Sequence, residues 1–212
     1  MPILPKNSST NMALSAKPQK LFRTMHEIEP YYRWLEFYHP YQDEQSPYHG
    51  EPEEKIYFTS AVYNYLIHPD WDSFGSETLY IKILYANYDN GHMIMEMIGE
   101  WNDALHNDIM YLKREIIDHF LPLGINKYIL IGESVFNYHG NETDYYEEWY
   151  SEVEDGWIVA MGFQEYVYKE WERFHLDYYI HFGGTLEIDN WRTLKPALVC
   201  ELVDKLITRR LN

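Results

Sequence analysis

The sequence contains a single cysteine, Cys200, among its 212 residues. One cysteine excludes an intramolecular disulfide and any zinc site that needs several cysteines. Cys200 lies in an apolar stretch, 198–203, with a helical pattern, so we expect a buried and unreactive thiol. The sequence also lacks an apolar run of membrane-spanning length, and residues 1–19 do not contain the apolar core of a secretory signal. These absences predict a cytoplasmic protein.

Positive charge is also scarce. Seventeen Lys and Arg residues stand against 34 Asp and Glu residues, which gives a formal net charge of −17. Such a surface repels phosphate backbones and anionic lipids, so we expect neither nucleic acid nor a membrane as a partner. A protein partner with a basic surface fits the charge, but an acidic surface is also a common route to solubility.

Motifs for nucleotide binding and hydrolysis are missing as well. The chain has no Gly-x-x-x-x-Gly-Lys-Ser/Thr, no Gly-x-Gly-x-x-Gly and no Gly-x-Ser-x-Gly stretch. A long helical pattern places Asp108, Glu115 and His119 along one flank, but a charged flank is usually solvated. Arg114 and Asp118, one helical turn apart, predict a surface ion pair instead. We therefore predict no cofactor and no metal site.

Apolar and aromatic residues are plentiful, at 46% and 17% of the chain. Three short apolar runs alternate with helical patterns, as is typical of parallel strands that are covered on both faces. The predicted strands cover 128–131, 157–161 and 177–182, with a loop at 133–141 after the first of them. The predicted helices cover 102–121, 144–154, 164–174 and 194–211, the last capped by Thr193.

Upstream, two segments alternate in strand fashion around Asn90 and Gly91, a pair that favours a tight turn. The segment 78–88, with Leu79, Ile81, Ile83 and Tyr85 on one face, and the segment 92–98, closed by Gly99, therefore predict a β-hairpin. The fold class that follows is α/β: a single mixed sheet, a β-hairpin and then mostly parallel βα units, with helices on its faces.

The N-terminal third differs in composition from the rest of the chain. We predict a flexible tail at 1–19, an aromatic helical extension and loop at 20–76, and the α/β domain at 77–212. The segment 21–41 carries a row of large apolar side chains, so we expect it to dock on the domain or on a second subunit. Residues 40–55 form a predicted loop, and 56–66 fits a short helix or a strand equally.

This order of elements resembles that of the STAS (SpoIIAA-like) domains. The local likeness is the stretch 98–104, Ile-Gly-Glu-Trp-Asn-Asp-Ala, which is similar to the Gly-Glu-Leu-Asp stretch that ends the family's second strand. Residues 128–131 stand where the family has its central strand. The resemblance covers the chain from about residue 78 onwards and implies an interaction scaffold. The family's phosphorylatable Asp-Ser-Ser-Gly stretch has no match, because the corresponding region, 135–141, contains no serine.

Candidate ligand-binding residues follow from the predicted sheet, since ligands of open parallel sheets bind beyond the carboxyl ends of the strands. Glu133 with His139 or His181 would form an acid–base pair if the fold brings them together. In the alternative interpretation, these polar groups only cap strand ends and helix N-termini. The candidates are Glu100, Glu133, Ser134, Asn137, His139, Gln164, His181 and Thr185.

The predicted helix 144–154 combines acids with aromatics, a composition that suits recognition of a basic partner. In the other interpretation, its aromatics cover the sheet and its acids face water. The candidate partner-binding residues are Tyr145, Glu147, Glu148, Trp149 and Glu152.

Two functions are compatible with the sequence. The favoured one is a non-catalytic cytoplasmic protein-interaction or regulatory domain of STAS-like architecture. The alternative is a small-molecule-binding protein or enzyme that uses the carboxyl-terminal edge of the sheet. A pocket that joins Glu133, His139 and His181 would favour the alternative, and a flat acidic surface would favour the first. Homo-oligomerisation is compatible with both.

Overall fold

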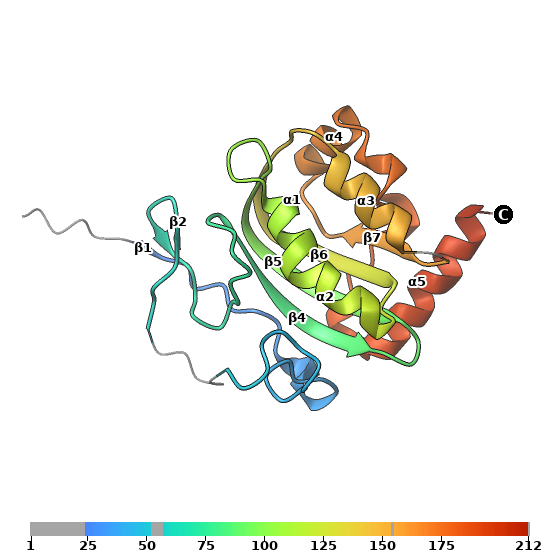
Figure 1. The fold of residues 1–212 in the computed structure, drawn as a ribbon, viewed down its shortest axis with the longest axis horizontal. Helices are drawn as coiled ribbons and strands as arrows, with labels where there is room; N and C mark the ends of the chain where they lie inside the picture. Colours follow the sequence, from blue (N-terminus) through green and yellow to red (C-terminus); the bar gives the residue numbers. More distant parts are fainter. Residues whose placement is uncertain (1–23, 52–56, 154, 212) are drawn as a thin grey trace, which may run out of the picture.

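The computed structural model describes residues 24–51, 57–153 and 155–211 (Figure 1), so the predicted tail lies outside the described residues. Its centre is a four-stranded sheet in the order β4-β5-β6-β7. β4 is antiparallel to β5, whereas β5, β6 and β7 are parallel to one another. The predicted α/β class and mixed sheet are therefore confirmed. The strands are β4 (Leu79–Asn87), β5 (His92–Asn102), β6 (Lys127–His139) and β7 (Trp157–Met161).

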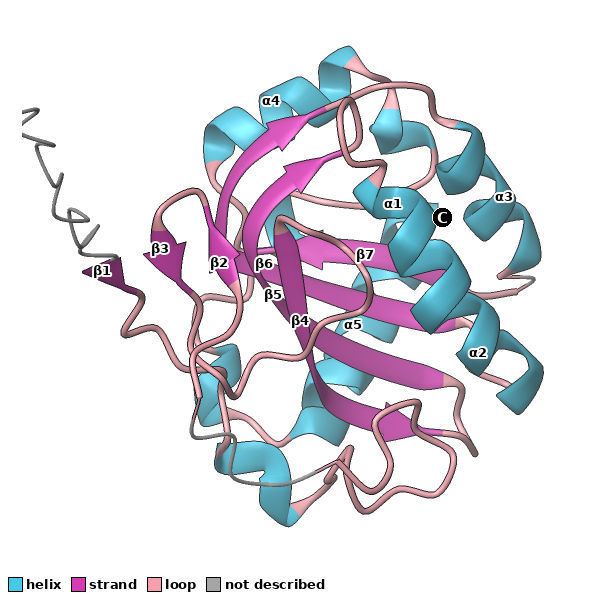
Figure 2. Cartoon of the chain, turned by 60° about the vertical axis from the view of Figure 1, so that its left-hand side comes forward, coloured by secondary structure: helices cyan, strands magenta, loops and turns pink. Residues whose placement is uncertain are grey.

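Helices cover both faces of this sheet (Figure 2). On one face, α1 (Asp108–Tyr111) runs through a π-helical stretch (Leu112–Ile117) into α2 (Asp118–Phe120) and a 3-10 turn (Leu121–Leu123). The same face carries α3 (Asp144–Glu152) and α4 (Glu165–Arg173). The opposite face carries α5 (Pro196–Leu211). Short 3-10 turns complete the fold at Arg33–Glu36, Leu176–Tyr178, Gly184–Leu186 and Trp191–Thr193.

The two faces bury separate apolar clusters. The larger cluster includes Met95, Leu130, Trp149 and Trp171, and it lies beneath α1 to α4. The smaller cluster joins Ile129 and other sheet residues to α5, and it contains Cys200. Burial raises the pKa of the Cys200 thiol to about 12. The prediction of a buried, quiet cysteine is confirmed as far as burial is concerned.

Both central strands are longer than predicted. β5 runs through Gly99 to Asn102, and β6 continues to His139, so the predicted loop at 133–141 and the predicted helix start at residue 102 are wrong. The physical reason is Gly99, which adopts a φ of +119° and lies so close to Thr78 that a Cβ would stand 2.1 Å from its carbonyl oxygen. Glycine therefore allows β5 to cross a register shift instead of ending there.

The predicted strand at 177–182 is not a strand. Its first residues form the 3-10 turn Leu176–Tyr178, and only His181 pairs with β7, opposite Val159. Tyr178 is exposed, so its aromatic ring does not cover the sheet as the apolar run suggested. The segment closes the outer edge of β7 through two hydrogen bonds, from His181 N to Ile158 O and from Ala160 N to His181 O.

Two further features differ from the prediction: the face on which Tyr85 lies and the start of the last helix. A register shift between Ile83 and Tyr85 moves Tyr85 to the α5 face, away from the other predicted members of its row. The last helix begins at Pro196, because Thr193 belongs to the preceding 3-10 turn and donates its hydroxyl to Asn190 O.

The N-terminal extension contains less helix than predicted. In its described part, only Arg33–Glu36 is helical, between the helix-breaking Pro30 and Pro40. The extension does pack on the domain, since Trp34 is buried and donates its indole N–H to Leu194 O at 2.9 Å. Strands β1 (Thr24–Met25), β2 (Ala61–Val62) and β3 (Tyr65–Leu66) form a second, small sheet in the order β1-β3-β2.

Within the described ranges, none of the helices combines the length and the apolar character that crossing a bilayer requires.

Candidate functional site

A cleft lies where the carboxyl ends of β5 and β6 meet the β2–β3 hairpin. It consists of two cavities of about 620 and 320 Å³, and both are lined by Tyr63 and Glu100. We call the pair the edge cleft. Its larger cavity is also lined by Ala61, Glu77, Thr78, Asn102, Ala104, Leu105, His106 and His139. Its smaller cavity is also lined by His26, Val62, Tyr65, Gly99, Phe136 and Asn137.

Glu100 is the central acid of the cleft. It lies near the carboxyl end of β5, opposite Asn137 in β6, and is only 3% exposed. Its Oε1 lies 2.7 Å from His139 Nε2 and accepts a hydrogen bond from Asn102 Nδ2 at 3.3 Å. A carboxylate removed from water needs such donors, because its burial is costly without them.

Tyr63 forms the opposite wall of the cleft. It begins the two-residue turn between β2 and β3 and has a φ of +53°, a conformation that a bulky side chain rarely adopts. Tyr63 is 71% exposed, but interaction of its hydroxyl with the carboxylate of Glu100 raises the pKa of Tyr63 to about 12. An unfavourable backbone conformation thus places a phenol over a buried carboxylate.

The Nε2 atom of His139 lies within hydrogen-bond distance of two groups that require opposite roles from it. Asn137 accepts a hydrogen bond from Tyr138 N at its Oδ1, so its Nδ2 faces His139 Nε2 at 2.9 Å. The same Nε2 lies 2.7 Å from Glu100 Oε1. One ring nitrogen either donates or accepts, so it cannot satisfy both the amide N–H and the carboxylate.

Two buried acids next to the cleft anchor the segments that line it. Asp108 accepts hydrogen bonds from Thr78 Oγ1 at 2.8 Å and from Asn102 N at 2.7 Å, which ties two lining residues to the start of α1. Asp103 accepts from Tyr146 Oη at 2.6 Å, and burial raises its pKa to about 7. These contacts fix the backbone of 100–108 against the sheet and α3.

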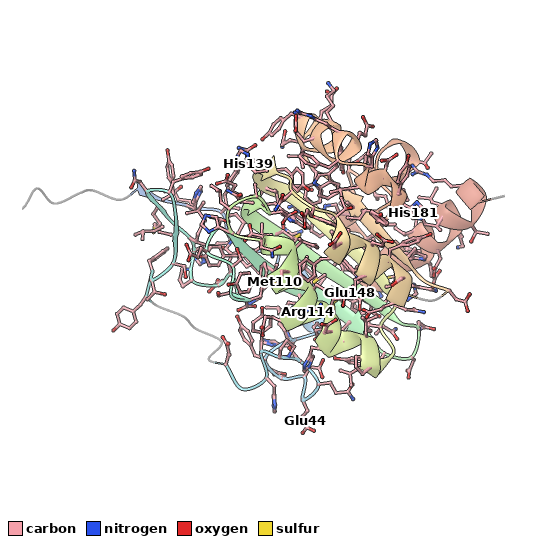
Figure 3. The ribbon with its side chains drawn as sticks, turned by 45° about the horizontal axis from the view of Figure 1, so that its top comes forward. Glu44, Met110, Arg114, His139, Glu148 and His181 are labelled. Atoms are coloured by element: carbon pink, nitrogen blue, oxygen red, sulfur yellow. The ribbon has the colours of Figure 1, made fainter. Side chains whose placement is uncertain are left out.

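The other predicted ligand-binding residues do not join this group. Glu133 accepts hydrogen bonds from Trp191 Nε1 and Arg192 Nη1, so its predicted pairing with His139 or His181 is not formed. Figure 3 shows His139 and His181 in separate parts of the molecule. Burial lowers the pKa of His181, which pairs with β7. Ser134 is opposite Ile98, Gln164 precedes α4, and Thr185 is exposed in a 3-10 turn.

The acidic helix α3 does not offer the predicted aromatic anchor. Trp149 is fully buried and packs edge-on against Tyr128, with ring centroids 5.1 Å apart. It shares the sheet-facing side of α3 with Tyr146, three residues earlier, so it is a core residue. Tyr145 lies beneath the guanidinium of Arg114, 5.3 Å from ring centroid to Cζ.

The acids of α3 are largely paired within the chain. Glu148 binds Arg114 through hydrogen bonds of 2.6 and 2.8 Å, a pair whose members are labelled in Figure 3. Glu152 lies 2.8 Å from the ammonium of the buried Lys113. Glu147 remains exposed at the surface. The predicted ion pair of Arg114 with Asp118 is confirmed at 2.8 Å.

Asp118, Glu148 and Glu152 place carboxylate oxygens within 4.8 Å of one another, an arrangement that suits a metal ion. The Lys113 ammonium already lies among them and contacts all three acids. Lys113 and Arg114 therefore already offset most of the negative charge of these three acids. The flank predicted from Asp108, Glu115 and His119 does not converge, since Asp108 binds Thr78 and His119 contacts Gln45 O.

The sequence-based prediction missed Tyr63, Glu77 and His106. Glu77 Oε2 lies 3.6 Å from His106 Nδ1 on the wall of the larger cavity. A signal for Tyr63 is present: Tyr63–Asn64 separates two short β-prone pairs, and asparagine is common in two-residue hairpin turns.

No protein-family model and no curated protein matches the chain. Among solved structures, it is similar to the anti-sigma factor antagonist SpoIIAA in its unphosphorylated form, at 13% sequence identity and a TM-score of 0.38. The similarity covers 54% of this chain and 97% of that chain. It agrees with the weak, topology-level resemblance that the sequence indicated.

Proposed function

We propose that this chain is a ligand-binding domain and that the edge cleft is its recognition site. The observation that carries the proposal is Glu100, a buried acid at the junction of two open cavities. Ligand sites combine apolar walls with a few convergent polar groups. The edge cleft has this composition, since Tyr65 and Phe136 line one cavity, and Glu100, Asn102 and His139 line the other.

The proposal also follows the rule that led to the candidates in the sequence, because the cleft lies at the carboxyl ends of β5 and β6. Three of those candidates, Glu100, Asn137 and His139, line it. If the chain is an enzyme, the acid–base pair is Glu100 with His139, since a carboxylate bound to an imidazole is suited to proton transfer.

A fragment screen by NMR tests the proposal. Protein labelled at histidine is titrated with neutral, cationic and anionic fragments, and the His139 ring signal is assigned with His139→Gln. Fragments that bind the cleft are expected to shift this signal in the wild type and to weaken or lose their effect in Glu100→Gln. Glu147→Gln removes the same charge from the exposed side of α3 and is expected to behave as the wild type. Hits that leave the His139 signal unchanged would contradict the proposal.

The second candidate function is the protein-interaction or regulatory domain of STAS-like architecture. A specific observation supports it: the rim of the cleft exposes Leu105 by 81%, together with Tyr63 and Phe136, beside acidic groups of a chain with a net charge of −17. Exposed aromatic and apolar side chains around an acid suit a basic partner segment. A peptide array with one fixed Lys or Arg per peptide, probed at low and high salt, tests this. Equal signals for Leu105→Ser and wild type would count against it.

A further inference from the structure

From the charges and hydrogen bonds of the edge cleft, we infer that its ligand is an amine: a primary ammonium or guanidinium group on an aromatic or apolar body. The inference rests on the proposed function and specifies the class of ligand. It is carried by three features of the cleft: the sign of its charge, the hydrogen-bond mismatch at His139 Nε2, and the aromatic walls of its smaller cavity.

The charge of the lining is negative. Glu100 and Glu77 contribute carboxylates to the larger cavity, and no Lys or Arg occurs among the described residues that line either cavity. The polar neighbours of the Glu100 carboxylate are Tyr63, Asn102 and His139. A buried carboxylate is bound most strongly by a cation that also donates hydrogen bonds. An anionic ligand would meet two acids in a chain that is already strongly negative.

The hydrogen bonds around His139 also favour an ammonium group beside Glu100. When Nε2 carries the proton and donates to Glu100, the Asn137 amide N–H faces another N–H. When Nε2 instead accepts from Asn137, Glu100 loses this donor. An ammonium group beside Glu100 removes the conflict, because it supplies the missing donor and leaves Nε2 free to accept from Asn137. In either tautomer of His139, one of its two polar neighbours, Asn137 or Glu100, lacks its partner on Nε2, and an ammonium group beside Glu100 lets both be satisfied.

The smaller cavity provides space for the body of such a ligand. His26 stacks on Phe136 with ring centroids 5.5 Å apart and planes 10° apart, and it also contacts Tyr65 at 5.0 Å. These rings and Val62 form apolar walls next to Glu100. Because Tyr63 and Glu100 line both cavities, a short ligand reaches the acid with its head while its body packs on the rings. Aromatic faces also attract cations directly.

Three matched probes test the inference: 2-phenylethylamine, 2-phenylethanol and 3-phenylpropanoate, each titrated into the full chain by calorimetry. We expect the amine to bind about tenfold or more tightly than the alcohol, and the carboxylate to bind least, because a charged hydrogen bond to a buried acid is lost in both analogues. Glu100→Gln is expected to abolish the preference for the amine over the alcohol. Glu147→Gln should retain it.

The outcomes separate the inference from the proposed function. Equal affinity for amine and alcohol, absence of amine binding, or a preference that survives Glu100→Gln would overturn the amine assignment. The histidine NMR screen tests the proposed function independently of the amine assignment, because it includes neutral and anionic fragments. If Glu100→Gln does not fold, as judged by near-UV circular dichroism, Glu77→Gln on the exposed wall serves instead, with a smaller loss of amine affinity expected. An unchanged affinity in that variant would then overturn the assignment.

Discussion

At the scale of single residues, Tyr63 combines a strained backbone with an exposed side chain that reaches a buried acid. Its backbone lies in the left-handed region and the residue is mostly exposed, yet its hydroxyl interacts with the buried Glu100. Such a conformation costs of order 1–3 kcal/mol in a non-glycine residue. The fold therefore keeps Tyr63 at a position where glycine would be more favourable.

This leads to the first prediction. Tyr63→Gly should leave the free energy of unfolding unchanged or raise it by roughly 1 kcal/mol, since the backbone strain is relieved and little apolar area is lost. The same variant should weaken binding in the edge cleft. Urea unfolding and the probe titrations measure the two effects. A loss of stability together with unchanged binding would show that Tyr63 has only a structural role.

The second prediction concerns Trp149, for which the sequence allowed either a partner-binding or a sheet-facing role, and which the structure places in the core. Trp149→Ala should destabilise the protein by about 3–5 kcal/mol, because a fully buried indole leaves a large cavity. Tyr145→Ala, on the partly exposed side of the same helix, is the comparison and should cost much less. Chemical unfolding measures both. A similar, small loss for the two variants would contradict the assignment of Trp149 to the core.

At the scale of elements, the sequence predicted which strands and helices exist better than where they end. Periodicity reports the face that a segment buries, so the order of β4 to β7 and the helix faces could be predicted from it. The ends of β5 and β6 depend on Gly99 and its approach to Thr78, a contact between separate segments. For the same reason, the pairing of Glu100 with His139 could not be predicted, since it needs the extension of both strands.

The third prediction concerns the N-terminal extension, whose division from the domain at residue 77 remains a proposal. Trp34 and Tyr31 attach it to the α5 face by hydrogen bonds to Leu194 O and Arg192 O. Limited proteolysis should therefore cut within 40–55 before it cuts within 24–39. Trp34→Ala should make 24–39 sensitive, because a buried indole and its hydrogen bond are lost. Early cleavage within 24–39 of the wild type would show that the extension is not docked.

At the scale of the whole molecule, two buried acids bind segments that are far apart in the chain. Glu96 accepts a hydrogen bond from Tyr31 N at 2.7 Å and pairs with Arg192, so it joins the extension, β5 and the segment before α5. Asp103 joins β5 to α3 through Tyr146. Burial raises the pKa of both carboxyl groups to about 7.

The last prediction follows from the sign of these shifts. A carboxyl group whose pKa is higher in the folded than in the unfolded state contributes stability that is complete below its unfolded value, near 4, and is lost as the pH rises through about 7. The free energy of unfolding should therefore fall between pH 5 and pH 8, by about 1 kcal/mol or more per group. Below about pH 4 the opposite trend should begin, because ion pairs lower the pKa values of Asp118 and Asp204.

Urea unfolding from pH 3 to pH 9 measures this profile. Asp103→Asn keeps the acceptor for Tyr146 but removes the titrating group, so it should flatten the decline between pH 5 and pH 8 even if it lowers stability overall. Glu147→Gln, an exposed acid on α3, is the control and should preserve the decline. If the wild type gains stability from pH 5 to pH 8, Glu96 and Asp103 are ionised in the folded protein at little cost. Their hydrogen bonds and the Arg192 pairing would then outweigh the effect of burial.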